Sequence, residues 1–124
     1  MNLQESVDYV VKKIVEQGGQ CREHEKCMYG NDRGQHCAVG WLLDSTNEEL
    51  MDFDEDVESL VISHHEEIPE IICLNVDVFD YIQRFHDGCA KNERRFILDR
   101  MITKYSHLIN FTGKHWEQWV DMGE

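Results

Sequence analysis

Two groups of cysteine, histidine and aspartate residues in this 124-residue chain have side chains that could bind a metal ion. The first group lies within one short stretch and consists of Cys21, His24, Cys27 and Cys37. Thiolates and imidazoles are the usual ligands of tetrahedral zinc, but this stretch has neither the Cys-x2-Cys knuckle nor the His-x3-5-His pair of zinc fingers. Reduced thiols beside surface histidines explain the same residues, and the sequence leaves both interpretations open.

The second group consists of His64, His65, His86 and Asp87. These residues loosely follow the ligand order of HD-type metal phosphohydrolases, in which His and Asp hold a divalent ion that activates water. A structural role also explains the last two, because an imidazole near the carbonyl end of a helix is favoured by the helix dipole and Asp87-Gly88 can end the helix. A metal-dependent hydrolase or a zinc-binding small protein is therefore the alternative function.

Other motifs that carry chemistry are missing from the sequence. There is no Walker loop, dinucleotide glycine fingerprint, Gly-x-Ser-x-Gly elbow or His-Glu-x-x-His pair. The acidic run from Asp52 to Asp56 imitates the start of a calcium loop, but Val57 replaces the required glycine and Ser63 the required glutamate. We therefore expect a protein that is not an enzyme and uses no cofactor.

The charge of the chain is concentrated in its middle third. The net charge is −13, and residues 44–83 contain thirteen Asp and Glu without a single Lys or Arg, whereas the flanking thirds are nearly neutral. Such a field repels nucleic acid and anionic lipid and attracts basic partners. The simpler interpretation is a solvated face that improves solubility.

The segment from Cys27 to Leu43 places turn-forming residues between two apolar stretches. Residues 30–34 tolerate positive φ or tight side-chain turns, which predicts a small β-hairpin formed by Cys27 to Val39. Gly40 lies between small and large apolar residues, which indicates a bend with close backbone approach before Trp41 enters the core.

Two segments of the chain resemble a family of small phage and bacterial proteins of uncharacterised activity. One has the pattern Cys27-x-Tyr29, a glycine-rich turn, Cys37-Ala38-Val39-Gly40-x-Leu42 and Asp44; the other is Tyr81-Ile82-Gln83-Arg84-Phe85-His86-Asp87, similar to the family's Leu-Gln-x-(aromatic or Ile)-His-Asp segment. The resemblance covers residues 16–87 and departs from the family between Asp44 and Ser63, where this chain is more acidic. It implies a phage or bacterial cytoplasmic setting and no particular reaction.

These observations together predict an acidic interaction protein that binds a basic macromolecular surface, such as a phage-type inhibitor of a host or defence protein that imitates the charge of nucleic acid. We expect a basic protein partner, no direct contact with nucleic acid and no membrane. The predicted binding residues are Glu48, Glu49, Asp52, Asp54, Glu55, Asp56, Glu58, Glu66, Glu67 and Glu70, with Trp116 and Trp119 as candidate aromatic anchors. Core packing is the alternative for the two tryptophans.

The expected fold is mainly α, a single domain over residues 1–124 with about five or six helices and the small β-hairpin. Apolar residues recur every three or four positions from Leu3 to Val15, and Gly18-Gly19 would end that helix. In the last long helix, opened by Asn92, we expect Phe96 to face the core and Arg94 to face water. No uncharged run approaches the ~20 residues that span a bilayer, and the odd set of five cysteines predicts reduced thiols and a cytoplasmic location.

Overall fold

The structure is a computed structural model that describes residues 2–18, 22–23, 26–27, 29, 36–53, 55–87 and 91–122. Within these residues the chain forms seven α-helices: α1 (Leu3–Gln17), α2 (Glu48–Met51), α3 (Val57–His64), α4 (Glu70–Leu74), α5 (Val76–Asp87), α6 (Lys91–Tyr105) and α7 (Lys114–Val120). A short 3-10 helix, Val39–Leu42, precedes α2, and strand β1 (Arg22–Glu23) pairs antiparallel with β2 (Lys26–Cys27). The mainly α prediction is confirmed, with seven α-helices in the described residues where about five or six were predicted.

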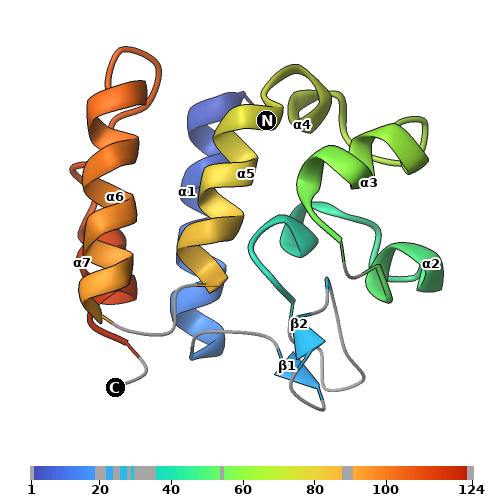
Figure 1. The fold of residues 1–124 in the computed structure, drawn as a ribbon, viewed down its shortest axis with the longest axis horizontal. Helices are drawn as coiled ribbons and strands as arrows, with labels where there is room; N and C mark the ends of the chain where they lie inside the picture. The colour runs from blue at the N-terminus through green and yellow to red at the C-terminus, as the bar shows by residue number, and fades with distance from the viewer. Residues whose placement is uncertain are drawn as a thin grey trace.

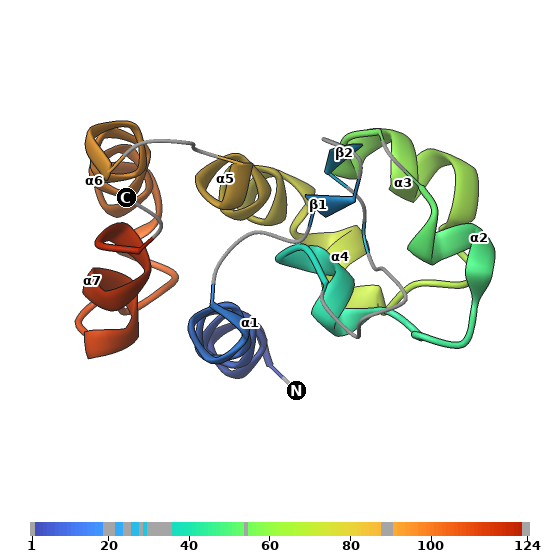
Figure 2. The ribbon, with the colours of Figure 1, turned by 90° about the horizontal axis from the view of Figure 1, so that it is seen from below.

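The helices form two groups that lie side by side. Helices α1, α5, α6 and α7 make a bundle, and α2, α3 and α4 lie beside it on the side away from α6 and α7, as both views show (Figures 1 and 2). Within the bundle α5 contacts α6, and α1 contacts α7; α3 and α4 contact α5, which joins the two groups. Helix α5 therefore lies at the centre of the fold.

Helix α1 forms where the sequence predicts it, because local signals agree with tertiary packing. Asn2 caps its first turn by accepting from the backbone N–H of Glu5 at 2.8 Å, and the Glu5 side chain accepts from the backbone N–H of Asn2 at 2.9 Å. Val7, Val10, Val11 and Ile14 are buried on one face. Gly18 ends the helix with φ 91°, a conformation that favours glycine.

The predicted hairpin from Cys27 to Val39 is not seen in the described residues. Val39–Leu42 forms a 3-10 helix, and the described antiparallel pairing joins Arg22 to Cys27 and Glu23 to Lys26 instead. The predicted turn at residues 30–34 lies outside the described residues. The close backbone approach at Gly40 is confirmed, since a Cβ there would overlap the carbonyl oxygen of Tyr29. The Tyr29 carbonyl thus occupies the space that a side chain at position 40 would need.

Aromatic side chains from α5 and α7 form the centre of the bundle. Phe85 lies edge-on to Trp119 at a centroid distance of 4.4 Å and to Trp116 at 5.7 Å. The two indole rings stack at 6.1 Å with an interplanar angle of 18°. Because offset stacks and edge-to-face pairs are the favoured aromatic arrangements, this cluster fixes α7 onto α5.

The orientation of α6 differs from the prediction at two positions. Arg94 is 5% exposed rather than solvent-facing, and Phe96 is 62% exposed rather than buried. The Arg94 guanidinium donates from Nε and Nη2 to the Val120 carbonyl, at 3.1 and 2.9 Å, and also to the Met122 carbonyl. A cation that satisfies the carbonyls at the end of α7 is stable in a buried position, so tertiary contacts rotate α6 away from its apolar pattern.

Candidate functional site

We define the acidic surface as the predicted carboxylates on and between α2, α3 and α4. All nine that the structure describes are exposed: Glu48, Glu49, Asp52, Glu55, Asp56, Glu58, Glu66, Glu67 and Glu70. Asp54, the tenth predicted residue, lies outside the described residues. Folding therefore gathers the described carboxylates in the helical group that faces away from α6 and α7 (Figure 1).

Some carboxylates of the middle segment stabilise their own backbone. Asp56 caps α3 by accepting from the Ser59 N–H at 2.8 Å, and hydrogen bonds from Ser59 lower the pKa of its carboxyl group. Asp44, just before α2, accepts from the Thr46 hydroxyl at 2.6 Å and from its N–H at 2.9 Å, which likewise lowers the pKa of Asp44. Local capping thus explains two of these charges and leaves most of the others without a structural role.

The basic residues of α6 that the structure describes contact groups outside the acidic surface. Arg95 of α6 pairs with Glu117 of α7, and Lys91 lies 3.6 Å from Asp121. The Lys104 ammonium lies 5.2 Å from the centre of the Tyr81 ring. Within the described residues, no Lys or Arg forms an ion pair with the acidic surface. The acidic surface is therefore not neutralised by the bases of α6.

An ion pair of an arginine with an acidic residue of the middle segment lies on α5. Arg84 contacts Asp80 at 3.2 Å, one helical turn away. Burial nevertheless raises the pKa of Asp80, and the neighbouring carboxylates of Asp56 and Asp77 act in the same direction. Asp80 was not among the predicted binding residues, and its partly buried position keeps it out of the acidic surface.

Two large apolar side chains are exposed on the helices that carry the acidic surface. Ile62 of α3 is 75% exposed, and Leu74 of α4 is 70% exposed. Sequence reasoning missed them as binding candidates, because an isoleucine and a leucine in helical segments are usually assigned to the core. Exposed apolar residues surrounded by charged ones are typical of protein interaction sites.

The structure corrects the two aromatic anchor candidates. Trp116 and Trp119 are each 2% exposed and belong to the aromatic cluster around Phe85. A partner could reach them only if α7 left the bundle. Core packing, the alternative interpretation, is the correct one for both.

The predicted hydrolase-like group is not assembled as a metal centre in the described residues. His86 is fully buried with its ring 6.3 Å from that of Trp119, whereas His64 lies beside Glu67 at the end of α3 and His65 is exposed. The side chain of Asp87 lies outside the described residues. Where three metal-ligating side chains do converge in the described chain, they are Glu49, His64 and Glu67.

The cysteine and histidine group is described only in part. Cys21, His24 and the side chain of Cys27 lie outside the described residues. Cys37 is buried, and its sulfur accepts from the Gly40 N–H at 3.4 Å. The zinc interpretation of this group stays a prediction.

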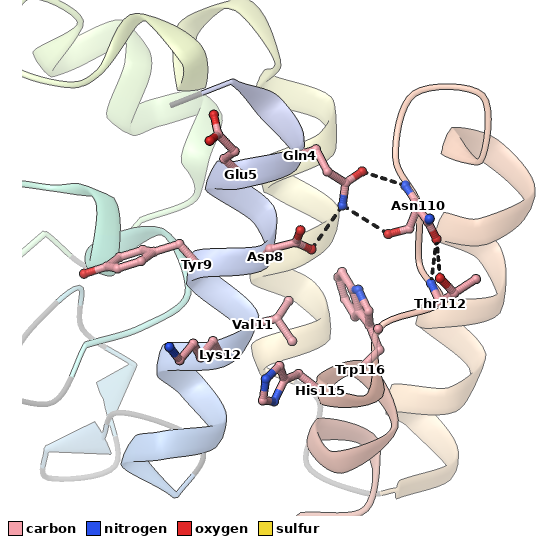
Figure 3. Close-up of a pocket in the computed structure, with 11 residues that line it drawn as sticks. Gln4, Glu5, Asp8, Tyr9, Val11, Lys12, Asn110, Thr112, His115 and Trp116 are labelled. Atoms are coloured by element: carbon pink, nitrogen blue, oxygen red, sulfur yellow. Dashed lines mark hydrogen bonds between the residues drawn. The ribbon is translucent and has the colours of Figure 1, made fainter.

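A cavity of about 700 Å³ lies between α1 and the segment that leads into α7 (Figure 3). The Gln4 amide joins its two walls, accepting from the Asn110 N–H at 2.7 Å and donating to the Asn110 carbonyl at 3.2 Å and to Asp8 at 3.0 Å. Trp116 lines the cavity and His115 lies beside it at the start of α7. These polar groups connect α1 to the segment before α7. The described residues that line the cavity include His115 but no cysteine or serine that could act as a nucleophile beside it.

No helix in the described part of the chain has the length and apolar character needed to cross a membrane. Comparison with known proteins finds no matching family model, no similar curated protein and no similar solved structure. The resemblance to small phage and bacterial proteins therefore stays a prediction, and the function of this chain has to be argued from its own surface.

Proposed function

We propose that this protein is an interaction protein whose acidic surface binds a basic surface on another protein. One observation carries the proposal. Nine described carboxylates are exposed on α2, α3, α4 and the turns between these helices, and no described Lys or Arg pairs with them. A surface with mixed charges is the usual solution for solubility, so a one-signed field of this size favours a steering role.

The two kinds of residue on this surface would act at different distances. Unpaired carboxylates attract a basic partner over roughly one Debye length, about 8 Å at physiological salt, and raise the association rate. Ile62 and Leu74 supply apolar area that loses water only on contact, which slows dissociation. Both effects are needed for a stable complex, since exposed ion pairs alone contribute little.

A basic surface that normally binds nucleic acid is the partner class that suits this charge best. Such surfaces present Lys and Arg to phosphate groups, and a protein covered with carboxylates competes for the same cations. Occupying the surface would inhibit the partner. Under the predicted phage setting, the partner would be a host or defence protein.

The proposal is tested by comparing the same charge reversal at two positions on the acidic surface and at two positions on the bundle. The double variant Asp52→Lys, Glu66→Lys reverses two exposed charges on the acidic surface; the control Glu16→Lys, Asp99→Lys reverses two exposed charges on α1 and α6. Both variants change the net charge equally. Immobilised wild-type protein and each variant are used to capture basic proteins from a bacterial lysate at low and high salt, and the affinity of a purified captured protein is then measured for all three.

We expect the wild type and the control to bind the same protein in a salt-sensitive way, and the surface variant to bind it at least tenfold more weakly, because reversing two charges removes attraction and adds repulsion. Added DNA should displace the partner if the bound surface is one that binds nucleic acid. Equal binding by the two variants would contradict the proposal. So would the lack of any salt-sensitive partner, which is the result expected if the acidity serves only solubility.

A further inference from the structure

We propose that Glu49, His64 and Glu67 form a binding site for a divalent transition-metal ion, with Zn²⁺ as the preferred ion. Glu49 lies in α2, His64 is the last residue of α3, and Glu67 lies in the turn that follows. One donor atom from each side chain lies within 4.8 Å of the other two. The site joins two segments that are fifteen residues or more apart in sequence, so only folding brings its donors together.

The donor atoms are close to the spacing that a bound ion requires. Two ligands about 2.1 Å from a tetrahedral zinc ion lie roughly 3.4 Å apart. His64 Nδ1 and Glu67 Oε1 are already 3.1 Å apart. A donor atom of Glu49 lies within 4.8 Å of the other two, and its exposed side chain can turn toward them. Water would complete the coordination, as it does at zinc sites with three protein ligands.

Contacts outside the site hold two of the ligands in place. The His64 side chain is 15% exposed, and its ring meets the Phe53 ring edge-on at 5.6 Å. The second oxygen of Glu67 accepts from the Asn47 amide at 2.7 Å. Orienting contacts of this kind support the ligands of natural metal sites.

The chemistry of the donors selects the class of ion. An imidazole nitrogen suits Zn²⁺, Cu²⁺ or Ni²⁺, whereas Mg²⁺ and Ca²⁺ prefer sites made entirely of oxygen. The imidazole distinguishes this group from the other carboxylates of the acidic surface, which offer oxygen alone. The unpaired negative charge around the site raises the local concentration of any cation.

This metal site does not depend on the proposed binding of a basic partner to the acidic surface. A bound ion would connect α2 to the end of α3, and because it binds only the folded chain it would raise the thermal stability. It would also reduce the negative charge of the acidic surface, so that metal occupancy would tune the attraction of a basic partner. Metal binding and partner binding can therefore fail separately.

The first experiment measures Zn²⁺ binding to metal-free protein by isothermal titration calorimetry, together with the melting temperature with and without Zn²⁺. We expect one ion per chain and a rise in melting temperature. His64→Ala and Glu49→Gln should each weaken binding at least tenfold and remove the rise. His65→Ala is the matched control, because His65 is an exposed neighbour outside the donor group, and it should bind like the wild type.

A second measurement distinguishes this site from the cysteine and histidine group near Cys27. Co²⁺ in place of Zn²⁺ shows an intense ultraviolet charge-transfer band only when thiolates are ligands, and we expect none. The Cys21→Ser, Cys27→Ser variant should retain binding. Glu49 is exposed, so Glu49→Gln should fold even if His64→Ala does not. The inference is overturned if no saturable binding occurs, if Glu49→Gln binds like the wild type, or if the thiolate band appears.

Discussion

The bundle of α1, α5, α6 and α7 and the acidic group of α2, α3 and α4 treat charge in opposite ways. In the bundle, Arg95 pairs with Glu117, Lys91 lies beside Asp121, and Arg94 is buried against the carbonyls of α7. On the acidic surface no described Lys or Arg pairs with a carboxylate. The bundle uses its charges to hold its own helices together, whereas under the proposed function the acidic surface presents its charges to a partner.

The two groups also differ in how their helices are stabilised. Helices α1 and α6 have fifteen residues each, whereas α2 has four and α4 five. Isolated helices that short do not form in water, so they depend on packing. Each short helix buries one fully enclosed residue, Leu50 in α2 and Ile72 in α4. The short helices therefore depend on packing against the rest of the fold, and their buried residues belong to the same core as those of the bundle.

The largest expected effect is on the aromatic cluster of the bundle. Phe85→Ala removes the ring that contacts both tryptophans and should lower the free energy of unfolding by about 3–5 kcal/mol. Phe96→Ala, on the exposed side of α6, should change it by less than about 0.5 kcal/mol. Urea unfolding of both variants measures the difference. Similar losses would show that the aromatic cluster around Phe85 does not stabilise the fold as expected.

An intermediate effect is expected at the cap of α3. Asp56→Ala should cost about 1 kcal/mol at neutral pH, because it removes the acceptor for the Ser59 N–H. The neighbouring Glu55→Ala is the control, since Glu55 is exposed and its side chain caps no helix.

The cost of Asp56→Ala should depend on pH in one direction. Hydrogen bonds lower the pKa of Asp56 in the folded state below its ordinary value of 3.8. The stabilisation is therefore complete above that value and is lost as the pH falls through the lower, folded pKa. Unfolding of Asp56→Ala and wild type compared from pH 7 downward should show the two curves converging in acid. A gap that widens in acid would contradict this assignment.

The smallest effect on stability is expected on the acidic surface. Asp52→Lys, Glu66→Lys should change the free energy of unfolding by less than about 0.5 kcal/mol at physiological salt, since neither side chain has a structural partner. At low salt the variant should be slightly more stable than the wild type, because two like charges become opposite charges. Unfolding at low and high salt tests this. A large loss would show that these charges support the fold rather than a partner.

Much of the fold could be predicted because it depends on interactions between neighbours in the chain. The apolar spacing from Val7 to Ile14 defines the buried face of α1, and Gly18 ends it. The composition of residues 44–83 fixes the sign of the field on the acidic surface, whatever the arrangement of the helices. The close backbone approach at Gly40 was also predictable, since glycine between apolar residues indicates it.

The remaining features depend on residues that are distant in sequence. Whether Trp116 is an anchor or a core residue is decided by Phe85, thirty-one positions earlier, and whether Arg94 faces water is decided by carbonyls at the end of α7. The convergence of Glu49 with His64 and Glu67 also depends on residues distant in sequence. Only the spacing of His64 and Glu67, three residues apart at the end of a helix, indicates from the sequence that these two side chains lie close together.

The sequence by itself determined the long helices and where the negative charge is concentrated, because propensity, periodicity and composition are properties of short stretches. Tertiary structure decided which side chains are exposed and which donors meet, because burial and coordination depend on partners that only folding brings within a few ångströms.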